Sequence, residues 1–235
     1  AAAMLLRHSL SLEAEAACIE TAVDKVRNLG VKVITGYWKD WGNPVAVLFD
    51  TKTVPKQFEN VYFDLKDGFA IEIPAGDIKC QQSVVFGRLI FEFLANFELA
   101  FGRGELSNKS RVCFYDWTAA AGLIFMAKWL EPVMQASLCL SQTRLGRLEP
   151  GSFHEAEEMA RELNVWHRFA LEKVAAKFAN DVTLLKGLSK DLVAKQLPCE
   201  RRHWIMFKSE KAEDSRSAEP SRVVRLLRVF SSSKP

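Results

Sequence analysis

Hydrophobic residues in the first thirty positions follow the period of a helix. Residues 4–6 form one apolar patch, and Ser9 to Ser11 interrupts it. From about Leu12, apolar residues recur at spacings of three and four, which is typical of one buried helix face. They are Ala16, Ile19, Val23 and Val26. Gly30 is a helix stop signal, so residues 1–30 predict a helix hairpin.

The period then changes to that of short strands. Runs of β-branched and aromatic residues occupy 31–38, 45–49, 60–65 and 69–73, separated by Gly, Pro, Asn or Asp. Asp67-Gly68 lies between the last two runs, and this dipeptide favours the positive φ angles of a tight hairpin turn. Residues 31–79 therefore predict a small antiparallel sheet.

From Cys80 onward the helical period returns. A stripe of Phe86, Ile90, Phe93, Phe97 and Phe101 predicts a core-facing helix that ends at the glycines of 102–104. Further helices are expected over 115–130, within 133–148, from 152 to about 179 and over 181–197. Ser152 and Glu155 have the spacing of a capping box at the start of the long one. The expected fold class is α+β: a helix hairpin (1–30), an antiparallel meander (31–79), a helical region packed with it (80–198) and a basic tail (199–235).

The tail is the part with candidate binding residues. Its centre, SEKAEDSRSAEPS, is polar and is expected to be disordered. Two basic clusters flank this centre, and residues 221–230 predict a basic amphipathic helix of the kind that contacts a partner helix or an anionic surface. The candidate partner-binding residues are Arg201, Arg202, Trp204, Arg222, Arg225 and Arg228. We expect a protein partner first, and an anionic surface or nucleic acid as the alternative. The purely structural explanation of the amphipathic pattern is that residues 221–230 pack onto the domain.

The amino-acid composition narrows the possible classes of protein further. Hydrophobic residues make up 49% and charged residues 26% of 235 residues, with a formal charge of +3, which is ordinary globular composition. The five cysteines lie far apart, and none forms a short metal-binding or redox pair. They indicate buried thiols in a reducing compartment, most simply the cytoplasm. The most apolar run, 119–127, is too short to span a membrane.

Catalytic signatures are missing from the sequence. Neither His154 nor His167 has the neighbours of a zinc-protease or di-iron helix. The stretch Gly102-Arg103-Gly104 follows a helix and lacks the third glycine of a dinucleotide loop. On these patterns we expect no catalytic, metal-binding or cofactor-binding residues, and no cofactor. Whether the chain is an enzyme stays open. If it is an enzyme of another class, Asp40, Trp41, Asp116 and Trp117 are the residues expected to line its cleft.

The opening stretch AAAMLLRHSL, followed by EAEAACIETAVDKV, resembles a helix pair near the C-terminus of 3-isopropylmalate dehydrogenase. The similarity covers residues 1–30 and includes none of the positions that carry that family's catalysis. It implies a fragment or fusion of a dehydrogenase-like oxidoreductase without its active site. The main hypothesis from the residues themselves is a non-catalytic interaction or assembly module, and the dehydrogenase fragment is the alternative.

Overall fold

The strands among the described residues form two separate sheets. The computed structural model describes residues 13–37, 45–51, 60–101, 110–130, 135–140, 152–184, 204–206 and 225–229. Strands β1 (Val33–Tyr37) and β2 (Val45–Phe49) pair antiparallel. The larger sheet has the order β6-β5-β4-β3-β7 and every pair in it is parallel. Its strands are β3 (Ser110–Tyr115), β4 (Gln135–Leu140), β5 (Asp181–Leu184), β6 (Trp204–Met206) and β7 (Arg225–Val229).

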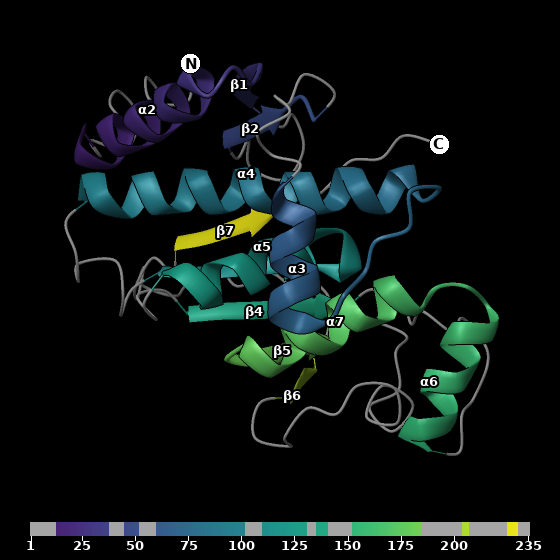
Figure 1. Cartoon of the computed structure of the whole chain (residues 1–235). Helices are drawn as coiled ribbons and strands as arrows, with labels where there is room; N and C mark the ends of the chain where they lie inside the picture. The colour runs from purple at the N-terminus through teal and green to yellow at the C-terminus, as the bar shows by residue number, and fades with distance from the viewer. Residues whose placement is uncertain are drawn as a thin grey trace.

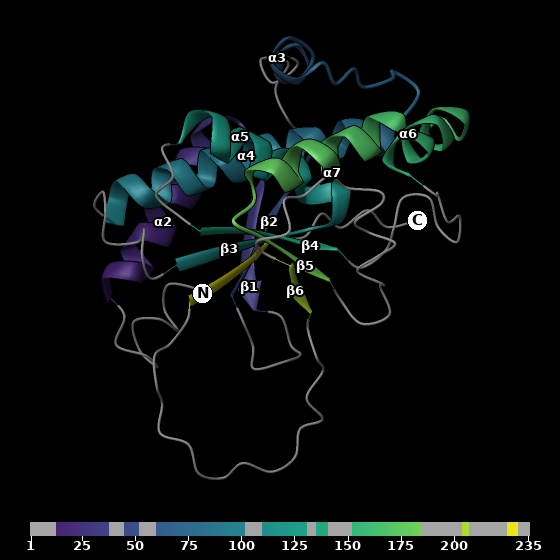
Figure 2. The same ribbon diagram turned by 90° about the horizontal axis from the view of Figure 1, so that it is seen from below.

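Helices connect and cover the parallel strands. The described helices are α2 (Glu13–Asn28), α3 (Val61–Phe69), α4 (Ile78–Phe101), α5 (Asp116–Trp129), α6 (Phe153–Glu162) and α7 (Trp166–Phe178). In the chain, helix α5 links β3 to β4, and α6 and α7 lie between β4 and β5. These crossover helices lie on one face of the parallel sheet (Figure 2). Helix α4 packs on α5, and α2 packs on α4 (Figure 1). The α+β class predicted from the sequence is confirmed.

The core is centred on α5. Every residue from Ala119 to Met126 is buried, because one side of this helix faces β3 and β4 and the other side faces α4. Gly87 of α4 meets Gly122 of α5, and a Cβ at Gly87 would lie 2.5 Å from Gly122 N, so the contact leaves no room for a side chain at Gly87. This contact fixes the position of the α4 N-terminus relative to the sheet.

Several expected elements are present. The apolar face of α2 is buried at Ala16, Val23 and Val26, and β1 pairs with β2 as the meander requires. Helix α4 carries the expected stripe, of which Phe86, Ile90 and Phe93 are buried, and α5 covers the span expected for a helix over 115–130. The N-cap half of the expected capping box is present, since Glu155 N donates to Ser152 Oγ at 3.2 Å.

The second half of the expected meander is wrong. Residues 61–69 form α3, and residues 70–74 follow without a β-ladder. Val61 and Leu65 are both buried, so a four-residue helical spacing determines the structure here. The expected Asp67-Gly68 hairpin turn is instead the last turn of α3, and the left-handed residue is Ala70, with φ of 54°.

The sequence patterns failed to predict the strands that are buried on both faces. The segment within 133–148 expected to be helical contains β4, and the start of the helix expected over 181–197 is β5. Residues 136–140 and 181–184 are all buried, so they lack the alternation that marks a half-exposed strand. A continuous apolar run cannot be distinguished from a buried helix by its period.

Two further helices differ from expectation. The long helix expected over 152–179 is divided into α6 and α7, because Asn164 adopts a left-handed conformation with φ of 53°. The helix expected over 221–230 is instead strand β7 over Arg225–Val229. The division into four regions at residues 30, 79 and 198 stays a prediction.

Candidate functional site

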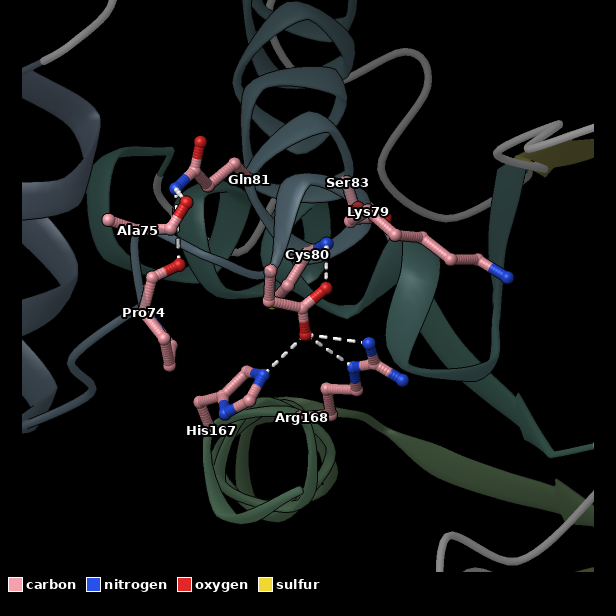
Figure 3. Close-up of polar contacts among 9 residues, drawn as sticks. Pro74, Ala75, Lys79, Cys80, Gln81, Ser83, His167 and Arg168 are labelled. Carbon is pink, nitrogen blue, oxygen red and sulfur yellow. Dashed lines mark hydrogen bonds and ion pairs between the residues drawn. The ribbon is translucent and has the colours of Figure 1, made fainter. Parts of the chain in front are cut away.

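Asp77 is placed by the turn that starts α4. Its Oδ1 accepts a hydrogen bond from Cys80 N at 3.0 Å, which is the arrangement of a helix N-cap. The preceding turn is held by the Gln81 side chain, whose amide donates to the carbonyls of Pro74 at 3.1 Å and Ala75 at 3.0 Å (Figure 3). The carboxylate is therefore fixed by the same residues that begin the helix.

Two side chains from the first turn of α7 meet this carboxylate. His167 Nε2 lies 2.6 Å from Asp77 Oδ2, and Arg168 Nε and Nη2 each lie 2.7 Å from the same oxygen. Figure 3 shows both side chains rising from α7 toward the start of α4. His167 is buried and Arg168 is partly exposed. The pair bridges two helix N-termini that are 90 residues apart in sequence.

The third contributor is the junction of β3 and α5. Trp117, in the first turn of α5, is buried, and its ring lies 4.7 Å from the Arg168 guanidinium carbon. Lys79 Nζ lies 6.0 Å from the same ring. Asp116 adopts a left-handed conformation with φ of 54°, directly after β3 ends. We call Asp77, Cys80, Trp117, His167 and Arg168 the α4–α5–α7 cluster.

The position of this cluster is that of a binding site in a parallel sheet. Helices that follow parallel strands begin at the carboxyl edge of the sheet, and ligands of open parallel sheets bind outside that edge. The first turns of α5 and α7 lie there by connectivity. The arrangement presents an arginine that is held on one side by a carboxylate and on one face by an indole ring.

The charges of the cluster follow from its contacts. Burial raises the pKa of the Asp77 carboxyl, but the hydrogen bonds from His167, Cys80 N and Arg168 outweigh it, so the net shift lowers this pKa. Burial, followed by the nearby Asp77 charge, raises the pKa of the Cys80 thiol to about 12. At neutral pH, Asp77 is therefore an anion and Cys80 is a neutral thiol.

Asp77, Cys80 and His167 also hold ligand-type atoms within 4.8 Å of one another, so a metal ion must be considered. Two ligands of a tetrahedral zinc ion lie about 3.3 Å apart, given metal–ligand distances near 2.0–2.1 Å. His167 and Asp77 are closer than this, and Arg168 bonds the oxygen that a metal would need. The arrangement fits an ion-pair network better than a metal centre.

The candidate residues of the tail lie elsewhere. Trp204 belongs to β6, whereas Arg225 and Arg228 belong to β7, and these strands occupy opposite edges of the sheet. Arg201, Arg202 and Arg222 lie outside the described residues. Among the described tail residues, Trp204 therefore lies at the opposite sheet edge from Arg225 and Arg228, and partner binding through the tail stays a prediction.

Sequence patterns missed the α4–α5–α7 cluster for a physical reason. Its residues come from three helices far apart in the chain, so they share no local spacing. Two signals in the sequence pointed toward the cluster. One is an aspartate directly before a helix, and the other is the Asp116-Trp117 pair, which was expected to line the cleft of an enzyme of another class. Asp40 and Trp41, named with that pair, lie outside the described residues. His154 is not part of the cluster: its side chain is exposed, and its Nε2 lies 3.6 Å from Glu158 Oε1 on the same helix.

Comparison with known proteins identifies the family. The family model for glycogen synthase matches residues 6–197, which include the whole cluster. The chain belongs to the glycogen synthase family. It is 26% identical over 180 residues to glycogen [starch] synthase of Neurospora crassa, covering 73% of this chain and 25% of that protein. The Dictyostelium discoideum glycogen [starch] synthase is 28% identical over 173 residues, covering 70% of this chain and 19% of that protein.

A mammalian relative gives the same result. The liver glycogen [starch] synthase of Mus musculus is 24% identical over 181 residues, which cover 73% of this chain and 25% of that protein. The matched part of the chain thus spans about a quarter or less of the length of these curated relatives. The glycogen synthase family match extends across almost all of residues 1–30 as well.

Two expectations are overturned by this family membership. The resemblance of residues 1–30 to 3-isopropylmalate dehydrogenase is wrong, because the glycogen synthase match begins at residue 6 and continues through that stretch to residue 197. A helix rich in Ala, Glu, Ile and Val is common to many amphipathic helices and carries little family information. The hypothesis of a non-catalytic interaction module is also wrong, since the matched family consists of synthases.

Proposed function

We propose that this chain acts in glycogen or starch synthesis as a segment of a glycogen synthase, with the α4–α5–α7 cluster beside the position of the activated sugar. One observation carries the proposal: the family match over residues 6–197 contains every residue of the cluster. The location of the cluster outside the carboxyl edge of a parallel sheet is independent support.

The chemistry of the reaction class agrees with the residues present. Extending a glucose polymer requires a glucosyl donor whose leaving group departs with negative charge. Arg168 is suited to that group, because Asp77 and the Trp117 ring hold its guanidinium in one orientation. In Figure 3 the second terminal nitrogen of Arg168 points away from the carboxylate. The positive ends of α5 and α7 add favourable potential for an anion.

Asp116 is the residue proposed to contact the sugar. It is half-buried at the end of β3, in a backbone conformation that few side chains other than Asn, Asp and Gly adopt readily. A backbone outlier of this kind gives the side chain a direction that a residue in a regular helix start does not have. A carboxylate at this edge is a suitable acceptor for sugar hydroxyl groups.

The test is binding of a nucleoside-diphosphate glucose to the purified chain, measured by calorimetry. Arg168→Gln should weaken binding about tenfold, since a hydrogen bond to a charged group contributes roughly 1.5–3 kcal/mol. Asp116→Asn should weaken it about fivefold without a change in backbone conformation, because asparagine tolerates positive φ. Arg161→Gln is the matched control: Arg161 also lies over an indole ring, that of Trp166 at 4.4 Å, but on α6.

The outcome against the proposal is equally specific. If Arg168→Gln and Arg161→Gln bind the donor as the wild type does, Arg168 does not hold the leaving group. Thermal melts of each variant separate a lost contact from a lost fold. If the unaltered chain binds neither donor nor maltooligosaccharide, the cluster is not a sugar-transfer site in this chain.

We also infer that the protein works in an intracellular, reducing compartment. Among the described residues, Cys18, Cys80, Cys113 and Cys139 are buried thiols and no disulfide joins them. A hydrogen bond with Cys113 and burial both raise the pKa of Cys139, so this thiol stays protonated and unreactive. No helix in the described ranges has the length and apolar character needed to cross a bilayer.

A further inference from the structure

Two strands of the parallel sheet come from beyond the part of the chain that matches the glycogen synthase family. The match ends at residue 197, whereas β6 and β7 follow at 204–206 and 225–229. They occupy the two outer positions in the order β6-β5-β4-β3-β7 (Figure 1). The three inner strands therefore belong to the family-matched body, and the tail supplies a strand at each edge.

The pairing of β7 with β3 covers nearly all of the inner strand. Ser110 to Phe114 are each in register with one residue from Arg225 to Val229. The covered strand belongs to the core, since Val112 and Phe114 are 1% and 0% exposed. An open edge on such a strand would present unpaired backbone N–H and C=O groups next to apolar side chains, which favours pairing with other chains.

The connection to β7 is long enough for independent docking. Residues 207–224 separate β6 from β7, and a segment of that length can span about 60 Å when extended. The two strands are four strand spacings apart, roughly 20 Å. Covalent geometry therefore does not force β7 onto this edge, and the backbone pairing with β3 is a contact that holds it there.

We propose that the open edge of β3 is an acceptor site for one extended peptide strand in parallel orientation, and that β7 of the same chain occupies it. Main-chain hydrogen bonds supply the affinity in this mode of recognition, and register supplies the specificity. The tail thereby closes a sheet edge of the family-matched body. This proposal does not depend on the function proposed for the α4–α5–α7 cluster.

The first experiment separates the strand from the body. A chain that ends at Met206 should lose amide protection, by tenfold or more in hydrogen exchange, at those residues among Val112, Cys113 and Phe114 whose N–H groups face β7, while the alternate β3 amides that face β4 and the β4 amides themselves stay protected. A labelled peptide of residues 221–230 should then bind with one-to-one stoichiometry and restore that protection. The control peptide carries Leu226→Pro and Leu227→Pro. Since the N–H groups of a strand point alternately to its two sides, one of these prolines must remove a donor that faces β3.

Two results of this experiment would overturn the proposal. One is unchanged protection of β3 in the shortened chain, which would mean that β7 does not cover this edge. The other is equal binding of the control peptide, which would mean that contact is not made through a backbone ladder.

A second experiment uses the full chain and does not depend on the shortened one folding. Arg228 is in register with the native Cys113, whereas Leu227 is in register with Val112. Mild oxidation of Arg228→Cys should therefore give an intrachain disulfide to Cys113, and Leu227→Cys should not. Equal cross-linking of both variants would overturn the register. A disulfide formed between two chains would show that the strand comes from a second copy and would overturn docking within one chain.

Discussion

Replacing Gly87 by alanine should destabilise the protein by about 3 kcal/mol or prevent it from folding. A Cβ at this position would lie 2.5 Å from Gly122 N and 2.7 Å from Ala121 Cβ. Overfilled cores typically lose about 1–3 kcal/mol, and the upper end applies here because the obstacle is backbone. Helix α5 cannot retreat, since its other side packs on β3 and β4. The measurement is the free energy of unfolding from urea denaturation.

Two other glycines are matched controls for Gly87. A Cβ at Gly122 would meet Phe114 Cε1 at 3.0 Å, so Gly122→Ala should cost less than Gly87→Ala. A Cβ at Gly68 would meet only the Lys128 side chain, whose Nζ at 2.9 Å can move away. Because Gly68 lies in α3, Gly68→Ala should stabilise the protein by roughly 0.5–1 kcal/mol. If Gly87→Ala unfolds at the wild-type denaturant concentration, the close approach of α4 and α5 is not as described.

Asp77→Ala should cost about 3 kcal/mol of unfolding free energy. The substitution removes the N-cap of α4, which contributes roughly 0.5–2 kcal/mol, and leaves His167 and Arg168 without their carboxylate. Removing one member of a buried ion pair costs about 3–5 kcal/mol, and Arg168 is 29% exposed, so we expect the lower end of that range. Urea denaturation measures this loss directly.

Asp77→Asn and Glu92→Ala separate the contributions. Asparagine is also a good N-cap, so Asp77→Asn should retain the cap and lose only the charge, with a smaller effect than alanine. Glu92 pairs with Arg88 at 2.7 Å on the same helix, and Glu92→Ala should cost about 0.5 kcal/mol or less. If Asp77→Ala costs no more than Glu92→Ala, the cluster does not couple α4 to α7.

The same carboxylate predicts a pH dependence. The pKa of Asp77 is lower in the folded protein than its ordinary value of 3.8, so the folded state favours the anion. Its contribution to stability is therefore present above the unfolded-state pKa and is lost as the pH falls through the folded-state pKa. The part of the stability difference between wild type and Asp77→Asn that comes from the aspartate charge should shrink as the pH falls below about 4. A difference that persists at pH 2 would contradict this assignment.

Local patterns in the sequence predicted α2, α4, α5 and the Ser152 cap, and failed for strands that are buried on both faces and for α3. The face of α2, the stripe of α4 and the Ser152 cap could all be identified, because each has one polar and one apolar side or a local partner. Strands β4 and β5 are buried on both faces, and only their parallel neighbours distinguish them from helices. The Asp77–His167 contact depends on the tertiary fold, so no spacing in the sequence reports it.

The pairing of β3 with β7 also has a consequence for biosynthesis. Ser110 is in register with Arg225, so the ribosome completes the core strand long before it makes the strand that covers its edge. At roughly 5–20 residues per second, the nascent chain carries that edge uncovered for several seconds or more. Slow translation, or termination before β7 is made, would leave a body whose β3 edge is open to aggregation, and chaperones are expected to bind the nascent chain in this interval.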